Sequence, residues 1–466
     1  MIERTLTSDT PTQIDKEVTL YGWVHSKRNM GQIVFVDLRD GFGLVQVVFA
    51  DNPGLQAQAE ELRPEFVVKI VGTVVKRGAK QVNDKLPTGS VEVQAHALEV
   101  INEAQTPPFE IDRENVEDEE LRLKYRYLDI RHERLHKNLL ARHQTITTIR
   151  EFLNNQGFID IETPILSAPT PEGARDFLVP SRKYPGSFYA LPQAPQQYKQ
   201  LLMVAGMERY YQIAKCLRDE DSRGDRQPEF TQLDLEMAFA DRETIMQLNE
   251  DLLIKIVKDN YPDKTIQTTP FPRLSYREAM DKYGTDRPDL RTDKSDPNLL
   301  AFVWITDFPF FEETDTGQWT FTHNPFSAVT DASQADLLAQ RNIDQIISQQ
   351  YDVVLNGFEI GGGSIRNHQP TSLLAALKIM GYDQAAAEKS FGHMLEAFTY
   401  GAPPHGGIAW GLDRLVMVLQ NEPNIREVMA FPKTDKFRDP MMDSPQAADP
   451  KILKELGLQT ITKSKT

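Results

Sequence analysis

The segment YYQIAKCLRDEDSRGDRQPEFTQLDLEMAF (210–239) contains two apolar runs on either side of a charged loop. This pattern predicts an antiparallel β-hairpin, with Arg218, Asp219 and Glu220 at the end of its first strand. An arginine at a strand end offers a planar fork of donors that suits a phosphate, and a nearby Glu can accept a hydrogen bond from an amine. Taken alone, the cluster also fits a charged loop that only keeps a hairpin soluble.

A second segment, GIAWGLDRLVMVL (407–419), predicts a Gly-rich strand that runs directly into an apolar helix. Arg414 falls in the first turn of that helix, and the glycines before it leave room for a ligand to approach the backbone. The same pattern also fits a buried ion pair between Arg414 and Asp413. The segment is therefore a candidate anion site that needs support from the rest of the chain.

A third segment, YDVVLNGFEIGGGSIR (351–366), carries two carboxylates and three consecutive glycines. Asp352 and Glu359 are seven residues apart, ahead of Arg366. Carboxylate oxygens are the protein ligands that Mg²⁺ prefers, and Mg²⁺ is usually bound together with substrate phosphates. Beside phosphate-binding arginines, these carboxylates indicate a Mg²⁺–nucleotide site, although the spacing alone supports it only weakly.

The first hundred residues have a different pattern, made of short β-branched and aromatic runs broken by Gly and Asn. Five such runs, with a helical stretch between the third and the fourth, predict the OB-fold. This small barrel often binds single-stranded nucleic acid, and its loop KRGAKQVNDK (76–85) is locally basic. The predicted strands cover residues 18–25, 32–39, 43–50, 66–77 and 90–100, and the predicted helix covers residues 53–62.

The remaining residues predict a second, larger domain of mixed α/β (α+β) type. A charged, Pro-initiated segment follows the barrel and suggests a hinge, and an apolar helical pattern and alternating strands and helices come after it. We expect an OB-fold domain at residues 1–105, a linker or hinge at 106–130, a catalytic domain at 131–440 and a C-terminal extension at 441–466.

The composition excludes several classes of protein. At about 150 residues per domain, 466 residues predict roughly three domains. Cys216 is the single cysteine, which excludes a disulfide framework and a cysteine-based zinc site. The sequence shows no secretory leader and no long apolar run, so we expect a cytoplasmic protein without a membrane partner. A net charge of −16 argues against non-specific coating of nucleic acid, but it leaves room for a nucleic acid held by a local basic patch. We expect no DNA partner.

Together, the segments resemble the three motifs of class II aminoacyl-tRNA synthetases. The first motif corresponds to the helix that runs into GFIDIETPIL (157–166), the second to the hairpin with Arg218, and the third to GLDR (411–414). The resemblance implies an antiparallel sheet flanked by helices, a homodimer built on the first motif, and ATP, L-aspartate and tRNA(Asp) as substrates. The segments that look like bacterial-type aspartyl-tRNA synthetases are TPEGARDF (170–177), LPQAPQQYKQ (191–200), THNPF (322–326) and GGGSIR (361–366).

The resemblance also implies roles for individual residues at the nucleotide. For catalysis, Arg218 would bind the α-phosphate of ATP and Glu220 would hold the adenine amine. Arg414 would cover one face of the adenine and reach the γ-phosphate, and Phe230 would stack on the ring. The implied ATP-binding set is Arg218, Asp219, Glu220, Gln227, Phe230, Glu359, Gly411, Leu412, Asp413 and Arg414, and the implied Mg²⁺ ligands are Asp352 and Glu359.

For the amino acid, the resemblance implies a side-chain carboxylate clamped by Lys199 and Arg366. Two cations suit a second carboxylate that asparagine lacks, and such a site rejects the neutral amide because its cations would stay unpaired. SAPTPEG (167–173) resembles the family's mobile loop, and its Pro and Gly suit a hinge. A lone histidine such as His323 also fits a structural role. The implied aspartate-binding set is Glu172, Gln196, Lys199, Arg218, Asp234, His323 and Arg366.

In the predicted barrel, the resemblance implies that Phe35 stacks on an anticodon base while Gln46 reads its edge. Such stacking contributes about 1–3 kcal/mol per base. Phe35 also fits a place in the barrel core. Relatives that also charge tRNA(Asn) tend to carry a His in the turn where this chain has Met30, which favours strict use of tRNA(Asp). The implied anticodon-binding set is Arg28, Phe35, Gln46, Arg77, Asn83 and Glu92.

The chain departs from the family between the second and third motifs. Bacterial-type relatives carry an additional domain there, after a segment like YGTDRPDLR (283–291), whereas about ten residues join Arg291 to FVWITDFPFF (302–311) here. Because the flanking motifs are intact, we expect the activation chemistry to be retained. Three alternatives stay open: an enzyme that also charges tRNA(Asn), an asparaginyl-tRNA synthetase, and a tRNA-binding paralogue without activity.

Overall fold

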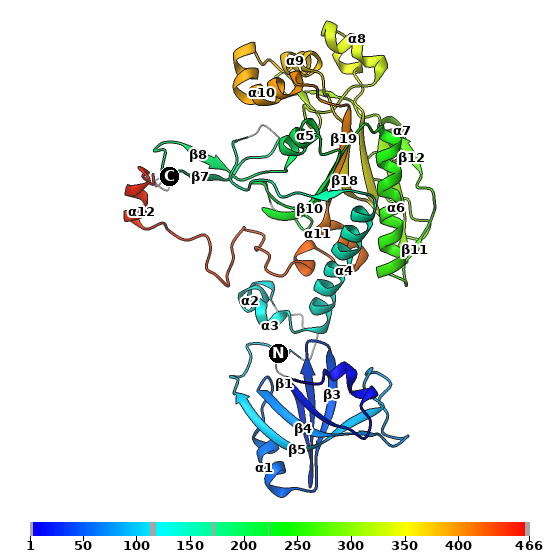
Figure 1. The fold of residues 1–466 in the computed structure, drawn as a ribbon, viewed down its shortest axis with the longest axis vertical. Helices are drawn as coiled ribbons and strands as arrows, with labels where there is room; N and C mark the ends of the chain where they lie inside the picture. The colour runs from blue at the N-terminus through cyan, green and yellow to red at the C-terminus, as the bar shows by residue number, and fades with distance from the viewer. Residues whose placement is uncertain (1–2, 112–117, 170–172, 222, 462–466) are drawn as a thin grey trace. The chain divides into compact units, whose positions relative to one another are not determined.

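The computed structural model describes residues 3–111, 118–169, 173–221 and 223–461. The chain forms two compact units, Met1–Arg134 and Leu135–Thr466. Each unit has a hydrophobic core of its own and is described separately (Figure 1). Among the described residues, no helix combines the length and the hydropathy needed to cross a membrane.

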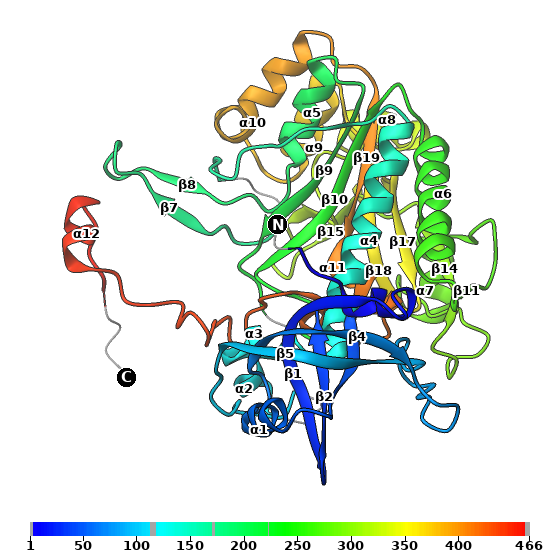
Figure 2. The same ribbon diagram turned by 60° about the horizontal axis from the view of Figure 1, so that its bottom comes forward.

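The first unit is built around a closed barrel with the strand order β1-β2-β3-β5-β4 (Figure 2). Its elements are η1 (Thr7–Thr12), β1 (Glu17–Met30), β2 (Ile33–Asp40), β3 (Gly43–Phe49), α1 (Pro53–Glu61), β4 (Val67–Lys76) and β5 (Val91–Asn102). The predicted OB-fold is therefore confirmed, including the helix between the third and fourth strands. Along β2, Val34 and Val36 fill the barrel, so Phe35 between them faces outward and is only partly buried. The alternative that placed Phe35 in the barrel core is wrong.

The segment after the barrel packs within the first unit around a buried carboxylate. It contains α2 (Glu119–Lys124) and α3 (Arg126–Asp129), within the range predicted as a linker. Asp129 is 1% exposed and accepts hydrogen bonds from Arg126 Nη1 at 2.6 Å and Arg122 Nε at 3.0 Å. Burial works against ionisation, but the hydrogen bonds from His132 and Arg122 lower the pKa of Asp129 to about 2.

We expect Asp129→Asn to lower the free energy of unfolding of the first unit by at least about 2 kcal/mol at pH 7, since each pKa unit is worth about 1.4 kcal/mol. A carboxylate with a lowered pKa stabilises the fold above its ordinary pKa of 3.8, and this contribution is lost as the pH falls toward 2. The difference from wild type should therefore shrink over that range.

Urea unfolding of the full chain, with hydrogen exchange of barrel peptides as the readout for this unit, measures the effect. Asp84→Asn is the matched control, because Asp84 is exposed in the loop between β4 and β5. Equal losses in the two variants would contradict the role of the buried carboxylate.

The second unit is built on a sheet with the strand order β12-β14-β17-β18-β19-β10-β9-β6. Its strands are β6 (Ile159–Asp160), β9 (Arg209–Leu217), β10 (Glu229–Ala238), β12 (Arg273–Ser275), β14 (Phe302–Thr306), β17 (Gln350–Leu355), β18 (Phe358–Ile365) and β19 (His405–Gly411). Within the described sheet, the edge pairs β12–β14 and β6–β9 are parallel and the other pairs are antiparallel. The predicted hairpin is β9 and β10, and the antiparallel sheet flanked by helices is confirmed.

Three helices cover one face of this sheet: α4 (Glu133–Asn155), α6 (Arg242–Asn260) and α11 (Leu412–Leu419). α4 and α6 lie side by side in Figures 1 and 2. The core under them contains Ile149 of α4, Leu253 of α6 and Leu235 of β10. Successive side chains of a strand point to opposite faces, so Asp234 and Glu236, on either side of Leu235, lie on the face away from this core.

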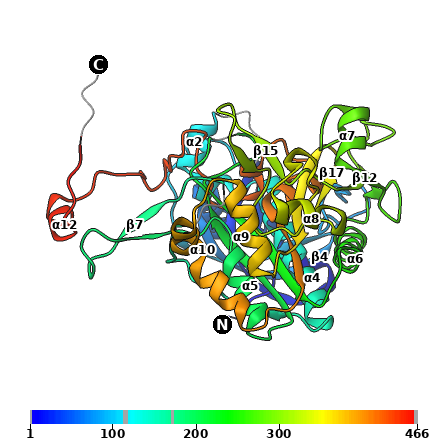
Figure 3. The same cartoon turned by 90° about the horizontal axis from the view of Figure 1, so that it is seen from above.

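A second group of helices forms a smaller core of its own. Figure 3 shows these helices from above. The group consists of α5 (Gln196–Val204), α9 (Pro370–Ile379) and α10 (Gln384–Thr399). Leu373 of α9 and Phe391 of α10 pack with Phe326, and Leu201 of α5 lies against them. α5 also contacts β9 and β10, which brings its first turns to the polar face of the sheet.

The remaining elements of the second unit are short. They are β7 (Leu178–Pro180), β8 (Phe188–Ala190), β11 (Thr265–Ile266), α7 (Tyr276–Tyr283), β13 (Leu299–Leu300), β15 (Phe311–Glu313), β16 (Trp319–Phe321), α8 (Asp331–Ala339), η2 (Ile343–Gln345), η3 (Ile425–Val428) and α12 (Pro450–Glu455). The connection around residues 291–301 is tied down. Lys264 Nζ donates to Pro297 O at 2.8 Å, and the Thr292 amide donates to Gln267 Oε1 at 2.8 Å.

Candidate active site

The polar face of the sheet carries two rows of residues that cross five strands. In the first row, Asp234 of β10 lies opposite Gln212 of β9 and Ala409 of β19. The row continues through Gly362 of β18 to Asp352 of β17. Between the two carboxylates the row holds only Ala409 and Gly362, whose side chains are small or absent. This leaves room for a ligand over the backbone between Asp234 and Asp352.

The second row lies beside the first and holds another buried carboxylate. Glu236 of β10 lies opposite Tyr210 of β9 and Gly407 of β19, and the row continues to Ser364 and Gln350. A Cβ atom at position 407 would collide with the carboxylate of Glu236 and with the neighbouring backbone. Glycine is therefore required at 407 for Glu236 to lie flat against the sheet.

Two cations lie over these rows and bind the carboxylates. Lys199 Nζ is 2.6 Å from Asp234 Oδ1 and 3.3 Å from Glu236 Oε2. Arg366 Nε is 2.9 Å from Glu236 Oε1, and its Nη2 is 3.2 Å from Oε2. All four side chains are at most 3% exposed. The structure thus brings together Lys199, Arg366 and Asp234 as predicted, and adds Glu236 to them.

The two carboxylates differ in their electrostatic surroundings. Burial works against ionisation of Glu236, but Arg366 and then Lys199 hold its pKa below the ordinary value. Burial raises the pKa of Asp234 above its ordinary value, even though Lys199 lies beside it. Asp234 Oδ2 has no hydrogen-bond partner among the described residues. Asp234 therefore retains an acceptor for a cationic ligand, whereas Glu236 is fully engaged.

A chain of hydrogen bonds links Gln196, on the same helix as Lys199, to His405. It lies three residues before Lys199 on α5, which places both side chains on one helix face. Gln196 Nε2 donates to Gln200 Oε1 at 3.2 Å, and Gln200 Nε2 lies 3.2 Å from His405 Nε2. The other ring nitrogen of His405 donates to Pro403 O at 2.7 Å, which leaves Nε2 to accept from Gln200.

Three residues of the predicted aspartate set remain, of which Arg218 lines the nucleotide cavity described below. His323 is exposed and packs edge-on against Phe308, with ring centroids 4.9 Å apart. The structure gives it a packing role of the kind that a lone histidine often has. Glu172 lies outside the described residues.

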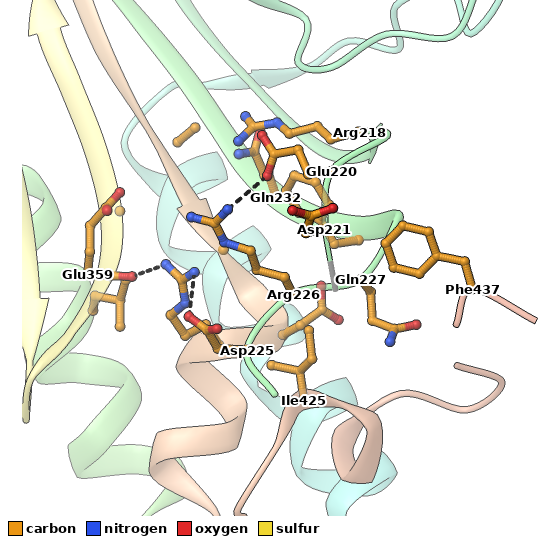
Figure 4. A pocket seen from close by; sticks show the side chains of 17 residues that line it. Arg218, Glu220, Asp221, Asp225, Arg226, Gln227, Gln232, Glu359, Ile425 and Phe437 are labelled. Carbon is orange, nitrogen blue, oxygen red and sulfur yellow. Dashed lines mark hydrogen bonds and ion pairs between the residues drawn. The ribbon is translucent and has the colours of Figure 1, made fainter. Parts of the chain in front are cut away.

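A cavity of about 190 Å³ lies beside the charged cluster, where the loop after β9 meets β18 and α11 (Figure 4). All of the predicted ATP-binding residues except Asp219 and Leu412 line it. The guanidinium of Arg218 lies 5.1 Å from the centroid of the Phe230 ring. The predicted phosphate ligand and the predicted adenine platform therefore lie together at this cavity.

Acidic side chains hold the other cations of the cavity. Arg226 Nη1 lies 3.1 Å from Glu220 Oε2, and Arg414 Nη2 lies 3.1 Å from Asp225 Oδ2. Arg414 also donates to the backbone oxygen of Glu359, and dashed lines mark these contacts in Figure 4. All of these side chains are partly exposed, so a ligand with phosphate groups can compete for the arginines.

Two predicted nucleotide residues do not line the cavity. Leu412 is wholly buried in the hydrophobic core under the helices, because the first turn of α11 points it away from the sheet's polar face. Asp219 instead forms a bridge with Arg175, with Asp219 Oδ2 and Arg175 Nε 3.9 Å apart. The ATP contacts of Leu412 and Asp219 stay predictions that the lining of this cavity does not support.

Asp413 and Gln227 line the cavity, but other parts of the chain occupy their polar atoms. Asp413 accepts from Arg142 Nη1 at 2.6 Å and from the Thr231 amide at 2.7 Å. The alternative ion pair between Asp413 and its neighbour in sequence is therefore wrong. Gln227 exchanges two hydrogen bonds with the backbone of Lys433, at 3.1 and 2.8 Å. Both residues hold the walls of the cavity in place.

Asp352 and Glu359 occupy adjacent antiparallel strands at the end of the first row. Burial raises the pKa of Asp352 well above its ordinary value, and the nearby carboxylate of Glu359 raises it further. Gln350 donates to Asp352 Oδ1 at 2.7 Å and keeps its own Oε1 without a partner among the described residues. Two mutually repelling carboxylates and a free amide oxygen fit a Mg²⁺ ion, although no cluster of three acidic, His or Cys ligands occurs in the described part of the chain.

The predicted anticodon residues gather on the outer face of the barrel. Arg28 and Phe35 are register partners on β1 and β2, and the guanidinium lies 5.9 Å from the ring centroid. Arg28 Nη2 donates to Gln46 Oε1 at 3.1 Å, and Gln46 Nε2 donates to Glu92 Oε2 at 3.1 Å. The structure thus places a partly buried, outward-facing aromatic ring beside a connected set of donors and acceptors.

The other two residues of this set differ in how closely they join it. Arg77 Nε lies 3.6 Å from Glu92 Oε2, which extends the network to the end of β4. Asn83 lies in the loop between β4 and β5, where its Oδ1 accepts from the Lys85 amide at 3.2 Å. Asn83 therefore supports a turn in that loop.

Comparison with known proteins agrees with this geometry. The family described as tRNA synthetases class II (D, K and N) matches residues 118–435, and the OB-fold nucleic acid binding domain family matches residues 18–101. The chain belongs to the class II tRNA synthetases. Two-step aminoacylation is the general reaction of these enzymes.

Similar proteins include an aspartate–tRNA(Asp/Asn) ligase of Rubrobacter xylanophilus, 41% identical over 96% of this chain and 95% of that protein. An aspartate–tRNA ligase of Staphylococcus epidermidis is 39% identical over 96% of this chain and 97% of its own length. The solved asparaginyl-tRNA synthetase of Pyrococcus horikoshii, complexed with asparaginyl-adenylate, has a TM-score of 0.75 and 25% identity, covering 93% of this chain and 99% of that one.

The alignment with the R. xylanophilus ligase spans 573 positions, more than the 466 residues of this synthetase. That relative therefore carries residues that this synthetase lacks. A domain missing between the second and third motifs stays a prediction.

Glu236, Asp225 and Arg226 contact predicted site residues but were not predicted from the sequence. Glu236 follows Asp234 at the next position on the same strand face, so the alternation in LDLEM carried the signal. Asp225 and Arg226 belong to the charged loop of the hairpin, where spacing gives no indication of which charges pair. All three act as partners of predicted residues.

We expect Gly407→Ala to destabilise this synthetase by about 1–3 kcal/mol, because the added methyl group overpacks the sheet against Glu236. Thermal denaturation measures the loss. Gly392→Ala within α10 is the control, since a Cβ there meets nothing within 4 Å and a helical Gly→Ala change is neutral or stabilising. If both variants were as stable as wild type, the sheet would accommodate an added methyl group at position 407, and the predicted overpacking would be wrong.

Proposed function

We propose that the chain ligates L-aspartate to tRNA(Asp) in two steps, with ATP as the second substrate. The observation that carries this proposal is the pair of buried cations, Lys199 and Arg366. They lie on the polar face of the sheet, and strands of this sheet also line the nucleotide cavity. A carboxylate side chain satisfies these cations, whereas the amide of asparagine leaves them short of negative charge. The names of the similar aspartate–tRNA ligases support the same substrate.

The chemistry of the first step needs position and charge neutralisation. An oxygen of the ionised α-carboxylate attacks the α-phosphorus, the bond to the β-phosphate oxygen breaks, and pyrophosphate leaves with the electron pair. No general base is required, because the nucleophile is already deprotonated. Arg218 and Arg414 neutralise the phosphates, and Phe230 supports the adenine.

In the second step, the 3′-hydroxyl of the terminal adenosine attacks the carbonyl carbon of the aspartyl-adenylate. The ester bond to the tRNA forms and the anhydride bond between the carbonyl carbon and the phosphate oxygen breaks. AMP leaves with the electron pair, and the hydroxyl proton is released to the leaving phosphate or to water. Asp234 would hold the α-ammonium group through its free Oδ2 in both steps. Asp352 and Glu359 would hold Mg²⁺, whose chemistry when bound is to offset the negative charge of the phosphates.

The choice of tRNA separates the strict enzyme from its relaxed alternative. Similar proteins carry both kinds of name, so the amino-acid site does not distinguish them. Met30 is 67% exposed at the turn between β1 and β2, on the barrel that carries Phe35 and Gln46. We propose strict use of tRNA(Asp), and charging assays on both transcripts test it; equal efficiency would establish the relaxed enzyme.

We also propose a cytoplasmic homodimer, as in the family it resembles. Light scattering coupled to gel filtration at micromolar concentration tests the assembly. A mass near twice 53.1 kDa is expected, and a monomer would refute it.

We expect ATP–pyrophosphate exchange without tRNA in the presence of aspartate, and little or none with asparagine or glutamate. Asparagine offers these cations no second carboxylate, and one extra methylene in a substrate typically changes kcat/KM by about 10–200-fold. Exchange driven by asparagine would support the asparaginyl-tRNA synthetase alternative. No exchange with any of the three would support the inactive paralogue.

We expect Phe35→Ala to lower kcat/KM for charging tRNA(Asp) by about tenfold or more, since stacking on one base contributes about 1–3 kcal/mol. Exchange without tRNA should stay unchanged, because Phe35 belongs to the barrel. Phe42→Ala is the matched control, as Phe42 is 60% exposed beyond the end of β2. A similar loss in both variants would argue against a specific role for the face around Phe35.

A further inference from the structure

The pairing between β10 and β19 ends at the nucleotide cavity. Gln232 is the last residue of β10 that pairs with β19, opposite Gly411, and the chain then enters α11. The neighbouring Thr231 has no residue of β19 opposite it, and its backbone amide donates to Asp413 Oδ2 at 2.7 Å instead. Asp413 therefore continues the connection between the two strands into the first turn of the helix.

This contact joins two residues that the nucleotide needs on opposite sides. Phe230 precedes Thr231, Arg414 follows Asp413, and both Phe230 and Arg414 line the cavity. In the proposed function, one of them supports a face of the adenine and the other covers the opposite face. The spacing between them thus depends on a hydrogen bond from a backbone amide to one carboxylate.

An arginine from a different part of the fold holds that carboxylate. Arg142 of α4 donates through Nη1 to the second oxygen of Asp413, Oδ1, at 2.6 Å. The side chain of Asp413 is 3% exposed and that of Arg142 is 16% exposed. A carboxylate this deeply buried is costly to keep ionised unless a cation pairs with it. Arg142 provides the cation without lining the cavity itself.

We propose that Arg142 is a positioning residue for ATP, which acts through Asp413. It holds the first turn of α11 against β10, so that Phe230 and Arg414 face each other across the adenine. This inference rests on the proposed use of ATP. Without Arg142, the Asp413 carboxylate loses its cation and turns toward water, and the Thr231 amide loses its acceptor.

Three variants separate this role from a purely structural one. R142Q removes the cation. The double variant R142Q/D413N replaces the ion pair by two neutral amides, and the oxygen of the new Asn can still accept from the Thr231 amide. T145V is the matched control: Thr145 lies one turn further along α4 and is wholly buried, and its hydroxyl lies 3.0 Å from Tyr261 Oη, away from the residues that line the cavity.

The measurement is the Kd of the full chain for ATP with Mg²⁺, by calorimetry, together with thermal unfolding of each variant. An unfolded fraction lowers the number of binding sites but leaves the Kd of the folded molecules unchanged. A change in Kd therefore reports position rather than stability.

We expect R142Q to raise the Kd for ATP by about tenfold or more, since misplaced groups in a binding site can cost up to about a hundredfold. The double variant should recover at least about threefold of this loss, because the two substitutions are coupled through one contact. T145V should unfold at a lower temperature and keep the Kd of wild type.

A folded R142Q with the Kd of wild type would overturn the proposal, as would an equal rise in Kd in T145V. If R142Q does not fold, R142K replaces it, because it retains the charge while its shorter side chain cannot make the same hydrogen bond. Wild-type affinity in R142K would then overturn the proposal. Failure of wild type to bind ATP would refute the proposed function and this inference together, whereas ATP binding without aspartate-dependent exchange would refute only the proposed function.

Discussion

The pairing of four buried charges on one sheet face is the constraint on which the active-site half of this protein depends. Removing one partner from a buried ion pair typically costs about 3–5 kcal/mol, because the other charge is left without compensation. Lys199 on α5 and Arg366 after β18 must therefore both reach β10, where Asp234 and Glu236 lie. The register of β10 against β19 follows from the same need, since only glycine at 407 leaves room for Glu236.

The nucleotide cavity is organised by weaker pairs. Arg226 is 43% exposed beside Glu220, and Arg414 is 21% exposed beside Asp225. Pairs of this kind contribute about 0–1 kcal/mol each, so exchanging them for phosphate groups costs little. The amino-acid side of the site is thus fixed in advance, while the nucleotide side can rearrange its cations around a ligand. Selectivity among amino acids belongs with the rigid part, because discrimination needs cations that cannot move to other partners.

Much of the fold was predictable because its signals are local. The barrel strands and the hairpin at 210–239 were marked by alternating apolar residues, and the strand that leads into α11 was marked by its glycines. The roles of Asp413 and Glu236 were not predictable in the same way. Asp413 pairs with Arg142, 271 residues away, and the partners of Glu236 come from α5 and β18. Such contacts depend on strand order and register, which no spacing in the sequence reveals.

Strand order also explains how the strands of the site come together across the short connection at residues 291–301. The short connection near residue 297 is held by Lys264, and β13 within it pairs with β11 before the chain enters β14. β14 then lies against β17, with Ile305 opposite Asp352. The sheet from β14 to β9 therefore combines strands that precede the connection at residues 291–301 with strands that follow it. Since each residue proposed for activation lies on this sheet or on helices and loops beside it, the chemistry depends on the part of the fold that the shorter chain retains.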